Sequence, residues 1–476
     1  MIPVIALLGR PNVGKSTLFN YLTRTRDALV ADYPGLTRDR QYGRGKVGKY
    51  PFIVVDTGGL ADDPNQIEEL MAKQVEFAVG EADLVLFMVD ARSGITASDE
   101  LIANQLRKLG KPVMLVMNKT EGIDSQTAAS DFYGMGMGDP ISIAASHGKG
   151  VLNMVDKIVD ILPGMDPDAE HEEDQYPGIR IAIVGRPNVG KSTLVNRLLG
   201  EDRVLAFDMP GTTRDSIFIP FEKEGEKFTL IDTAGVRRRS KIKESVEKFS
   251  IVKTMQAIDS ANVVIMVLDA HQGIADQEAT ILGHIVETGR ALIIAVNKWD
   301  GVEKSDKENV KEEIDRRFQF LDFVKYHYIS ALHGTGVGHL LESVKKAYAS
   351  ARKEMQTSDL TRILEMAVQE HQPPLIKGRR IKLRYAHQGG KNPPKIIIHG
   401  NQTAAVPAAY KRYLINTFRR AYKLVGTPIR VEFKGGDNPY KDRTNRVSER
   451  TVRRERLKKK ERKGGKISKS RNNSAN

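Results

Sequence analysis

The stretch GRPNVGKSTL occurs twice in this 476-residue chain, from Gly9 to Leu18 and again, unchanged, from Gly185 to Leu194. Each copy matches the phosphate-loop pattern G-x-x-x-x-G-K-[ST]. An apolar run precedes each copy and a helix-compatible run follows it, so each loop is predicted to join a buried strand to a helix start. Backbone N–H groups at such a helix start are unpaired and point at one place, which makes an anion site. The sequence therefore predicts two phosphate-binding sites.

The similarity between the two halves extends well past the loops. At 28 and 47 residues after its first glycine, each loop is followed by a threonine and an aspartate: Thr37 and Asp56, then Thr213 and Asp232. The repeat is much longer than the roughly 20 to 50 residues of a solenoid unit. It indicates a duplicated domain.

Apolar runs alternate with helix-compatible stretches in both repeats, which is typical of an α/β fold with doubly wound, mostly parallel sheets. The strands expected in the first repeat are Val4–Leu8, Phe52–Asp56, Leu84–Val89, Val113–Met117 and Pro140–Ile143. Those expected in the second are Ile179–Val184, Phe228–Asp232, Val263–Leu268, Leu292–Val296 and His327–Ile329.

The chain after the repeats has a different pattern, which predicts a small α+β domain. The expected elements are a helix over Ser358–His371, strands over Arg380–His387 and Lys395–His399, a helix over Pro407–Tyr422 and a strand over Pro428–Phe433. We therefore divide the chain into a first repeat (1–162), an acidic flexible linker (163–178), a second repeat (179–350), the α+β domain (351–440) and a basic tail (441–476). The tail has few apolar residues and is expected to be disordered until it meets a partner.

Composition limits the classes of protein that this chain can be. It contains no Cys, which excludes disulfides, thiolate zinc sites and cysteine catalysis. The N-terminus does not resemble a signal peptide, and no apolar run approaches the roughly 18 residues of a membrane helix. We therefore expect a cytoplasmic protein without a membrane span.

The net charge of +14 is concentrated in the last quarter of the chain. Residues 441–476 hold 15 Lys and Arg against 4 Asp and Glu, and residues 351–440 hold 17 against 6, whereas residues 1–350 hold 42 against 50. This uneven distribution predicts a polyanionic partner for the C-terminal part. The alternative is an ordinary solvated surface.

Residue types around each loop predict a magnesium-dependent triphosphate site. Lys15 and Lys191 would reach the β- and γ-phosphates, and Ser16 and Ser192 would ligate Mg²⁺. The hydroxyls of Thr37 and Thr213 would complete the coordination shell of Mg²⁺. Asp56 and Asp232 would not bind the ion directly but would hydrogen-bond to the groups that do. The backbone N–H groups of Gly59 and Gly235 would contact the γ-phosphate. Loss of that phosphate would release both segments, as in nucleotide-driven switches.

A second set of residues predicts selectivity for guanine. In Asn297-Lys298-Trp299-Asp300, the carboxylate would accept from guanine N1–H and N2–H₂, and Asn297 would read the other edge of the base. Ser330-Ala331 would offer a backbone N–H to guanine O6. The first repeat has Asn118-Lys119-Thr120-Glu121 and Ala144-Ala145 at these places, with Glu121 instead of an aspartate.

With these motifs, the chain resembles the translation-factor-related small GTPases and, among them, the bacterial tandem GTPase family called Der or EngA. Two full motif sets in one chain, followed by Gly390-Lys391-Asn392-Pro393-Pro394, carry this resemblance over about residues 1 to 440. It implies two P-loop GTPase domains and a KH-like C-terminal domain. It also implies GTP hydrolysis and a role in assembly of the large (50S) ribosomal subunit. The Gly-x-x-Gly loop with which KH modules clamp a nucleic-acid backbone is missing, so basic charge is the better reason to expect ribosomal RNA as a partner.

Both predicted sites lack one side chain that many GTPases use in hydrolysis. Many GTPases orient the attacking water with a glutamine right after Asp-x-x-Gly, where this chain has Leu60 and Val236. Similarity to GTPases with an asparagine in the phosphate loop, here Asn12 and Asn188, implies a bound K⁺ near the phosphates and K⁺-stimulated hydrolysis. The alternative is that both asparagines only shape their turns. Arg237, Arg238 and Arg239 would serve as arginine fingers, contact RNA, or stay solvated until a partner docks.

The residues of the predicted sites have catalytic, Mg²⁺-binding and nucleotide-binding roles. The catalytic residues are Lys15, Lys191, Thr37, Thr213, Asn12 and Asn188, and the Mg²⁺ residues are Ser16, Thr37, Asp56, Ser192, Thr213 and Asp232. The residues predicted to bind GTP or GDP in the first repeat are Gly9, Arg10, Pro11, Asn12, Val13, Gly14, Lys15, Ser16, Thr17, Asp56, Thr57, Gly58, Gly59, Asn118, Lys119, Glu121, Ala144 and Ala145. Those in the second repeat are Gly185, Arg186, Pro187, Asn188, Val189, Gly190, Lys191, Ser192, Thr193, Asp232, Thr233, Ala234, Gly235, Asn297, Lys298, Asp300, Ser330 and Ala331.

Two other functions remain open at this point. One is a GTPase of tRNA modification, although such proteins have one GTPase unit and a C-terminal Cys. The other is an RNA-binding scaffold that holds two nucleotides without hydrolysing them, which the retained Lys, Thr and Asp residues argue against. We expect a monomer.

Overall fold

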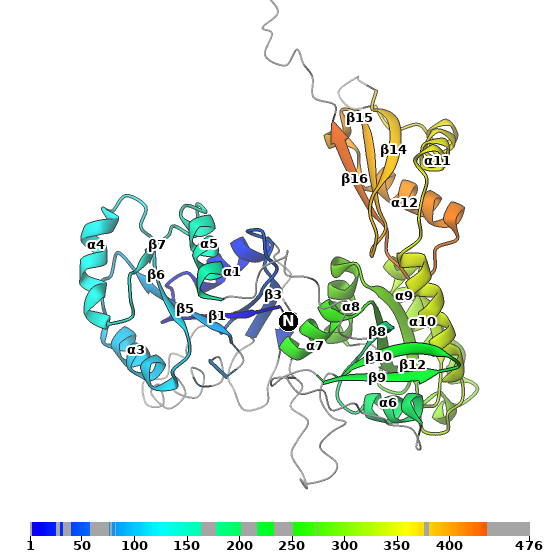
Figure 1. Cartoon of the computed structure of the whole chain (residues 1–476), viewed down its shortest axis with the longest axis horizontal. Coiled ribbons are helices and arrows are strands. Elements are labelled where there is room, and N and C mark those ends of the chain that lie inside the picture. Colours follow the sequence, from blue (N-terminus) through cyan, green and yellow to red (C-terminus); the bar gives the residue numbers. More distant parts are fainter. Residues whose placement is uncertain are drawn as a thin grey trace, which may run out of the picture.

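Three β-sheets organise the chain. The computed structural model describes residues 2–24, 29–31, 40–57, 76, 79–80, 82–162, 178–200, 217–232, 251–273, 275–375 and 380–435 (Figure 1). Each sheet belongs to one of the three predicted units. The linker predicted at 163–178, apart from Gly178, and the tail predicted at 441–476 lie outside the described residues.

The first sheet has seven strands in the order β2-β3-β4-β1-β5-β6-β7. They are β1 (Val4–Leu8), β2 (Leu29–Ala31), β3 (Arg40–Arg44), β4 (Ile53–Asp56), β5 (Leu84–Asp90), β6 (Val113–Asn118) and β7 (Ile141–Ser142). Helices α1 (Lys15–Thr23) and α5 (Val151–Ile161) pack on one face, and α3 (Ala97–Leu109) and α4 (Ser125–Phe132) on the other. Along the sheet, β4, β1, β5, β6 and β7 pair in parallel, whereas β3 is antiparallel to both of its neighbours, β2 and β4.

The second sheet repeats this plan with six strands in the order β13-β12-β11-β8-β10-β9. They are β8 (Ile179–Val184), β9 (Ile217–Lys223), β10 (Glu226–Asp232), β11 (Val263–Asp269), β12 (Ala291–Asn297) and β13 (Lys325–Tyr328). One face carries α6 (Lys191–Leu199) and α10 (Gly338–Ala351). The other face carries α7 (Ile251–Ser260), α8 (Asp276–Thr288) and α9 (Asp306–Arg317).

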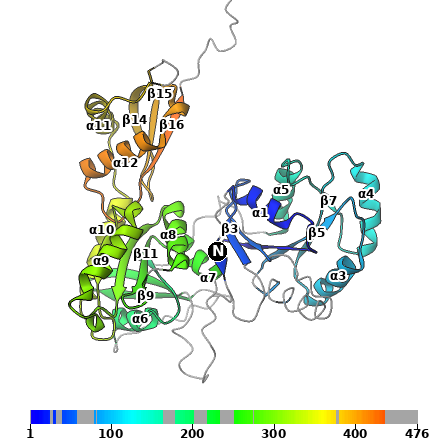
Figure 2. The same ribbon diagram turned by 180° about the vertical axis from the view of Figure 1, so that it is seen from behind.

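The third sheet has three strands, β14 (Lys382–Gly390), β15 (Lys395–Asn401) and β16 (Arg430–Gly435). Strand β15 is antiparallel to β14 and parallel to β16. Helices α11 (Thr357–Glu370) and α12 (Ala408–Tyr422) share one hydrophobic core with the sheet. The figures show this unit standing on the second repeat, with its helices and its sheet forming two layers (Figures 1 and 2).

These elements confirm the predicted fold class. Every strand expected from the sequence is present, with ends that differ by a few residues. Three strands were not predicted: β2 and β9, which lie at sheet edges, and β3, which lies between β2 and β4. Strand β3 reads RQYGR, which has no apolar run, and β9 contains Pro220, which argues against a strand except at a sheet edge. Among the described helices, none combines the length and the apolar character that a bilayer span requires.

The two repeats contact each other through β3 and α7. An apolar cluster joins Val4, Tyr42, Ile53 and Val55 of the first repeat to Ile251, Val252 and Met255 of the second. Beside it, Arg44 Nη1 lies 2.7 Å from Asp259 Oδ1, and the Asp259 side chain is only 1% exposed. Strand β3 begins three residues after Thr37, and α7 follows residues 233–250, which lie outside the described residues. The contact therefore lies next to the predicted switch segments of both repeats.

The C-terminal domain is anchored on the second repeat by backbone hydrogen bonds. Gly426 N–H donates to Phe323 O at 2.8 Å, and Gly426 O accepts from Leu292 N–H at 2.7 Å. With φ 69°, and with Ala347 Cβ 2.7 Å from where an added Cβ would lie, Gly426 has no room for a side chain. Asn392 N–H donates to Ala351 O at 2.9 Å, so the family-typical segment from Gly390 to Pro394 contributes to this junction.

Candidate functional site

The two phosphate loops have the same backbone geometry. Gly14 and Gly190 have φ values of 97° and 96°, and Gly9 and Gly185 have 152° and 151°. A Cβ added at Gly9 would lie 2.4 Å from Met88 O on the neighbouring strand, and one added at Gly185 would lie 2.4 Å from Val267 O. The glycines are therefore required by the turn and by the close approach of the next strand.

Asn12 and Asn188 lie in the left-handed region, with φ values of 66° and 63°. Asparagine tolerates this conformation better than most residues. The turn alone thus gives a reason for asparagine at both positions.

Lys15 is held inside its loop. Its Nζ donates to Gly9 O at 2.8 Å and to Arg10 O at 2.9 Å, and the residue is 5% exposed. Burial lowers the pKa of Lys15 to about 8, although the nearby charge of Asp56 acts in the opposite direction. In the second loop Lys191 Nζ donates to Arg186 O at 2.6 Å. Both lysines therefore curl over their own loop, at the place where a phosphate chain would lie.

Each loop ends at a helix start that has no side-chain cap. Gly14 and Gly190 are the N-cap residues of α1 and α6, and neither helix has a capping hydrogen bond from a side chain. Ser16 and Thr17, like Ser192 and Thr193, occupy the first turn of their helix. The unpaired N–H groups and the helix dipole fit a bound phosphate.

A carboxylate and a hydroxyl meet beside the first phosphate loop. Asp56 is 2% exposed at the end of β4, and its Oδ2 accepts from Ser16 Oγ at 2.8 Å. Oxygen ligands of this kind suit Mg²⁺, which binds through few protein groups and keeps several waters. The residues present thus fit the predicted ion at the first site. In the second repeat Asp232 ends β10, but its side chain lies outside the described residues.

One asparagine in each repeat joins the phosphate loop to the base-binding loop. Asn118 Nδ2 donates to Val13 O at 2.8 Å, and Asn118 Oδ1 accepts from Ala145 N–H at 3.0 Å. Asn297 makes the same two bonds, to Val189 O at 2.8 Å and from Ala331 N–H at 2.9 Å. These bonds form a brace between the two loops. The predicted contacts of the asparagines and of a backbone N–H in Ser330-Ala331 with guanine stay predictions, since each amide nitrogen carries a second N–H.

The lysine after each of these asparagines is oriented by an aspartate that the sequence analysis missed. Lys119 Nζ lies 2.7 Å from Asp90 Oδ2, and Lys298 Nζ lies 2.6 Å from Asp269 Oδ2. Burial alone would raise the pKa of Asp90, but hydrogen bonds from Lys119 and Arg92 N–H and the charges of Lys119 and Arg10 lower it below its usual value. The repeat held a signal, because Asp-Ala-x-x-Gly begins at both aspartates.

The predicted base-reading carboxylates have different neighbours in the two repeats. Glu121 Oε1 accepts from Arg92 Nη2 at 3.0 Å, whereas Glu121 Oε2 is buried and has no hydrogen-bond partner among the described residues. Asp300 lies 3.4 Å from His333 Nε2. The hydrogen bond from the Ser330 hydroxyl, followed by backbone bonding and the charges of His333 and His271, lowers the pKa of Asp300. The predicted contacts of Glu121 and Asp300 with guanine stay predictions.

Other residues predicted to bind the nucleotide make contacts that stabilise the loops themselves. Arg10 Nε lies 3.5 Å from Asp99, and Arg186 Nε lies 2.9 Å from Glu278, so both arginines tie their loop to the first turn of a helix. The side chains of Val13 and Val189 are buried in the core, which leaves only their backbone for a ligand. Thr57 Oγ1 donates to Leu7 O at 2.9 Å. Pro11 and Pro187 follow Arg10 and Arg186 in their loops. In the base loops, Ala144 N–H donates to Lys149 O at 2.9 Å and Ser330 N–H to Thr335 O at 3.0 Å.

Part of each predicted site lies outside the described residues. It comprises Thr37, Gly58, Gly59 and Leu60 in the first repeat, and Thr213, Thr233, Ala234, Gly235, Val236 and Arg237 to Arg239 in the second. Their predicted roles stay predictions.

Burial of Lys15 predicts a pH dependence of nucleotide affinity at the first site. A phosphate binds the protonated amine, and with a pKa of about 8 in the free site the protonated fraction falls as the pH rises through 8. In a Lys191→Ala background, the affinity of the first site for MgGDP should fall about tenfold between pH 7 and pH 9. Calorimetric titration would measure it.

The control is Lys15→Arg in the same background, because a guanidinium stays protonated in this range. Its affinity is expected to be nearly constant between the two pH values. An equal decline in the arginine variant would show that some other group titrates.

Comparison with known proteins agrees with this geometry. Residues 4–119 and 180–298 match the family model described as "50S ribosome-binding GTPase". Residues 354–434 match the model described as "KH-domain-like of EngA bacterial GTPase enzymes, C-terminal". These matches cover both repeats and the domain after them.

Curated relatives match over nearly their whole length. The chain is 59% identical to GTPase Der of Thioalkalivibrio sulfidiphilus over 450 residues, which are 94% of this chain and 97% of that protein. It is 59% identical to GTPase Der of Azotobacter vinelandii over 473 residues, 96% of each chain. It is 54% identical to GTPase Der of Vibrio vulnificus over 477 residues, covering 94% of this chain and 96% of that protein. Two braced phosphate-loop sites and a KH-like domain in one chain, with identity at this level throughout, place the chain in the Der (EngA) family of bacterial tandem-domain GTPases.

Proposed function

We propose that this GTPase uses its two nucleotide sites as switches that assist assembly of the large (50S) ribosomal subunit. The observation that carries the proposal is the combination of two phosphate loops of equal geometry with a basic KH-like domain fixed to the second repeat. A switch needs one part that senses the nucleotide and another that holds the target. The chain has both.

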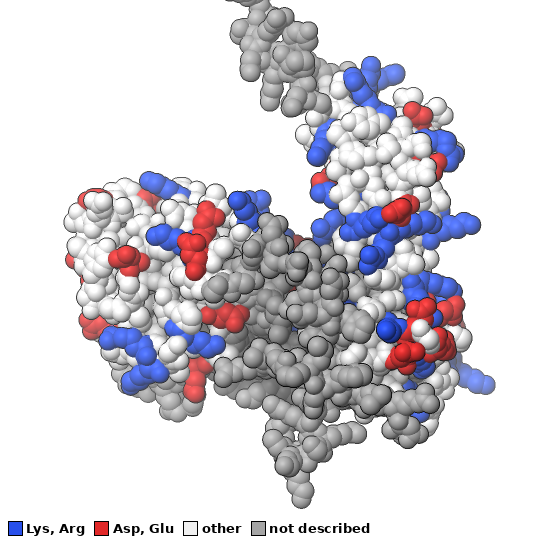
Figure 3. All heavy atoms as spheres, in the orientation of Figure 1, with Lys and Arg blue, Asp and Glu red and all other residues white. Residues whose placement is uncertain are grey.

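The charge of the C-terminal domain supports a polyanionic partner. Its strands carry Lys382, Arg384, Lys395, Arg430 and Lys434 against one acid, Glu432. Figure 3 shows Lys and Arg side chains across this domain and its junction with the second repeat. Ribosomal RNA is the polyanion that fits a family described by 50S binding, and phosphate contacts of this kind dominate affinity for nucleic acid.

At each site, the residues of this chain would share the work of hydrolysis. The loop lysine and the N–H groups at the helix start hold the β- and γ-phosphates and offset the negative charge that develops on them. Mg²⁺, when bound through Ser16 or Ser192, supplies further positive charge, and Asp56 orients the serine hydroxyl at the first site. Glu121 and Asp300 accept from the guanine edge. Equal affinity of the protein for GDP and ADP would contradict that last assignment.

We also propose domain limits at 162, 178, 350 and 440, a monomeric state and a cytoplasmic location. We further propose switch roles for Thr37, Thr213, Gly59 and Gly235. The match over both repeats and the C-terminal domain favours this function over tRNA modification or a non-hydrolysing scaffold.

Sedimentation with purified ribosomal subunits tests the proposal. The protein should co-sediment with 50S subunits several-fold better with a non-hydrolysable GTP analogue than with GDP, because only the γ-phosphate distinguishes the two states. Lys15→Ala and Lys191→Ala are the matched controls, and each should reduce this nucleotide preference. A chain ending at Tyr440 should keep the preference but show weaker binding and a shallower salt dependence, since it has lost phosphate-binding charge. Equal binding in both nucleotide states would contradict the proposal.

We also propose that K⁺ near Asn12 and Asn188 stimulates hydrolysis. The support is the loop asparagine at both sites together with Leu60 and Val236, which cannot orient a water. Turnover should be at least several-fold faster in KCl than in NaCl at equal ionic strength, and the difference should shrink in the double variant Asn12→Gly, Asn188→Gly, because glycine keeps the left-handed turn without the side-chain oxygen. Identical rates of the unaltered protein in the two salts would leave only the turn-forming role.

A further inference from the structure

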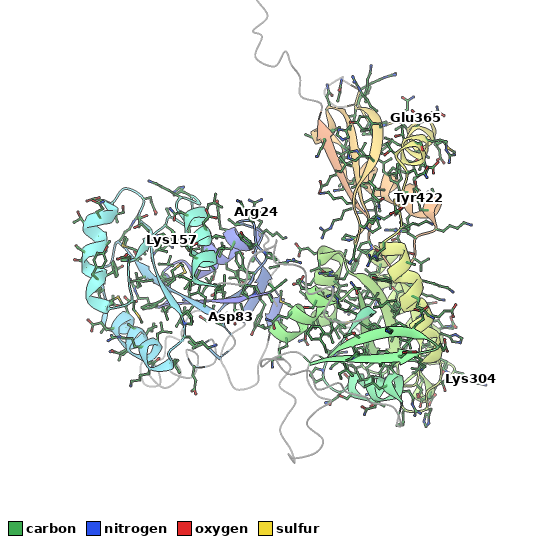
Figure 4. The ribbon with its side chains drawn as sticks, in the orientation of Figure 1. Arg24, Asp83, Lys157, Lys304, Glu365 and Tyr422 are labelled. Atoms are coloured by element: carbon green, nitrogen blue, oxygen red, sulfur yellow. The ribbon has the colours of Figure 1, made fainter. Side chains whose placement is uncertain are left out.

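The KH-like sheet has one face that its helices do not cover. Successive residues of a strand point to opposite faces. Ala386, Ile396 and Ile398 pack into the core with α11 and α12, so Tyr385, His387 and His399 point to the other face. Glu365 on α11 and Tyr422 on α12 mark the helical layer (Figure 4). We call the opposite side of β14, β15 and β16 the open face.

Three aromatic rings gather on the open face. The register pairs Tyr385 with His399 across β14 and β15. Their ring centroids lie 4.4 Å apart with an interplanar angle of 5°, and His387 stacks on His399 at 5.0 Å and 26°. Tyr385 is 43% exposed, and both histidines are partly exposed. The three rings thus form a stacked array that is partly open to solvent.

The array lies among cations. Burial, followed by the neighbouring charges of His387 and Lys434, lowers the pKa of His399. Lys434 pairs with His399 across β15 and β16, and Lys382 and Arg384 are exposed at the start of β14. The one acid on these strands, Glu432, is neutralised by Lys395 at 2.8 Å.

This combination fits an unpaired nucleobase better than other ligands. Every base has a flat π-face that stacks on aromatic side chains, and the phosphates beside it are attracted by Lys and Arg. Bases inside a duplex are already stacked, so only single-stranded segments, loops or bulges offer a free face. A protein partner that added a strand would instead use the backbone of a sheet edge.

We propose that the open face is a stacking platform for unpaired bases of an RNA strand, with Tyr385, His387 and His399 as the ring surface. The cations around the rings hold the flanking phosphates. This site deepens the proposed function, on which it rests, because it names single-stranded RNA as the part of the target that this domain binds. It also gives the domain a way to bind RNA without a Gly-x-x-Gly clamp.

The test compares two strands that differ only in their bases. The full chain is titrated, at fixed salt, with a fluorescent ten-nucleotide RNA and with an abasic strand of the same length. Tyr385→Ala should weaken RNA binding about tenfold, in line with the effect of removing one stacking ring, and should leave abasic binding unchanged. Tyr385→Trp should restore RNA affinity. The salt dependence should not change in either variant, because no phosphate-binding charge is removed.

Two controls separate stacking from damage to the protein. Tyr133→Ala removes another exposed tyrosine, 55% exposed in the first repeat, and should have no effect on RNA binding. GTP turnover of Tyr385→Ala should equal that of the unaltered protein, since Tyr385 lies on β14 of the third sheet, whereas the phosphate loops follow β1 and β8 of the other two sheets.

Several results would overturn the platform. One is that the unaltered protein binds the abasic strand as tightly as the RNA. Another is that Tyr385→Ala has the same RNA affinity as the unaltered protein. If Tyr385→Ala lost 50S association while keeping its RNA affinity, the open face would bind a protein instead. Any of these results, together with nucleotide-dependent 50S association of the unaltered protein, would leave the proposed function standing. Absence of that association would contradict the proposed function itself.

Discussion

The side-chain amide of one asparagine in each repeat holds together segments that lie far apart in the chain. Asn118 spans from Val13 O to Ala145 N–H, and Asn297 spans from Val189 O to Ala331 N–H. Both amides are nearly buried, at 3% exposure, so neither bond is easily replaced by water. A Cβ at Gly14 or Gly190 would lie 2.3 Å from the same amide nitrogen. The loop glycine, the brace and the base loop therefore depend on one another.

The two sites share this brace and differ around it. Glu121 pairs with Arg92 in the first repeat, whereas Asp300 faces His333 in the second. The repeats also meet through β3 and α7, where Arg44 pairs with the buried Asp259. The Arg44 side chain is 25% exposed and the Asp259 side chain 1% exposed, so loss of Arg44 would leave a nearly buried carboxylate without this partner. This ion pair lies next in sequence to the predicted switch segments of both sites.

Sequence patterns predicted the core strands and phosphate loops because both depend on local chemistry. Apolar runs such as Leu84–Val89 form strands wherever a core forms, and a glycine pattern such as Gly9 to Lys15 specifies one turn. The patterns did not show that the Asn297 amide connects the phosphate loop to the base loop. They also did not show that Asp90 and Asp269 orient Lys119 and Lys298. In both cases the partners come from distant segments of the chain. The patterns also missed β3 and β9, which are defined by antiparallel pairing with β4 and β10 and not by an apolar run of their own. The stacking of Tyr385 on His399 likewise depends on strand register.

Hydrogen–deuterium exchange of the nucleotide-free protein tests the brace most directly. In Asn297→Ala, amide exchange should rise both in the phosphate loop at 186–191 and in the base loop at 330–335, while the loops of the first repeat should stay as they are. Asn118→Ala should give the mirror result in the first repeat. Faster exchange confined to the base loop, with an unchanged phosphate loop, would contradict the account and leave the asparagine as a reader of the base alone.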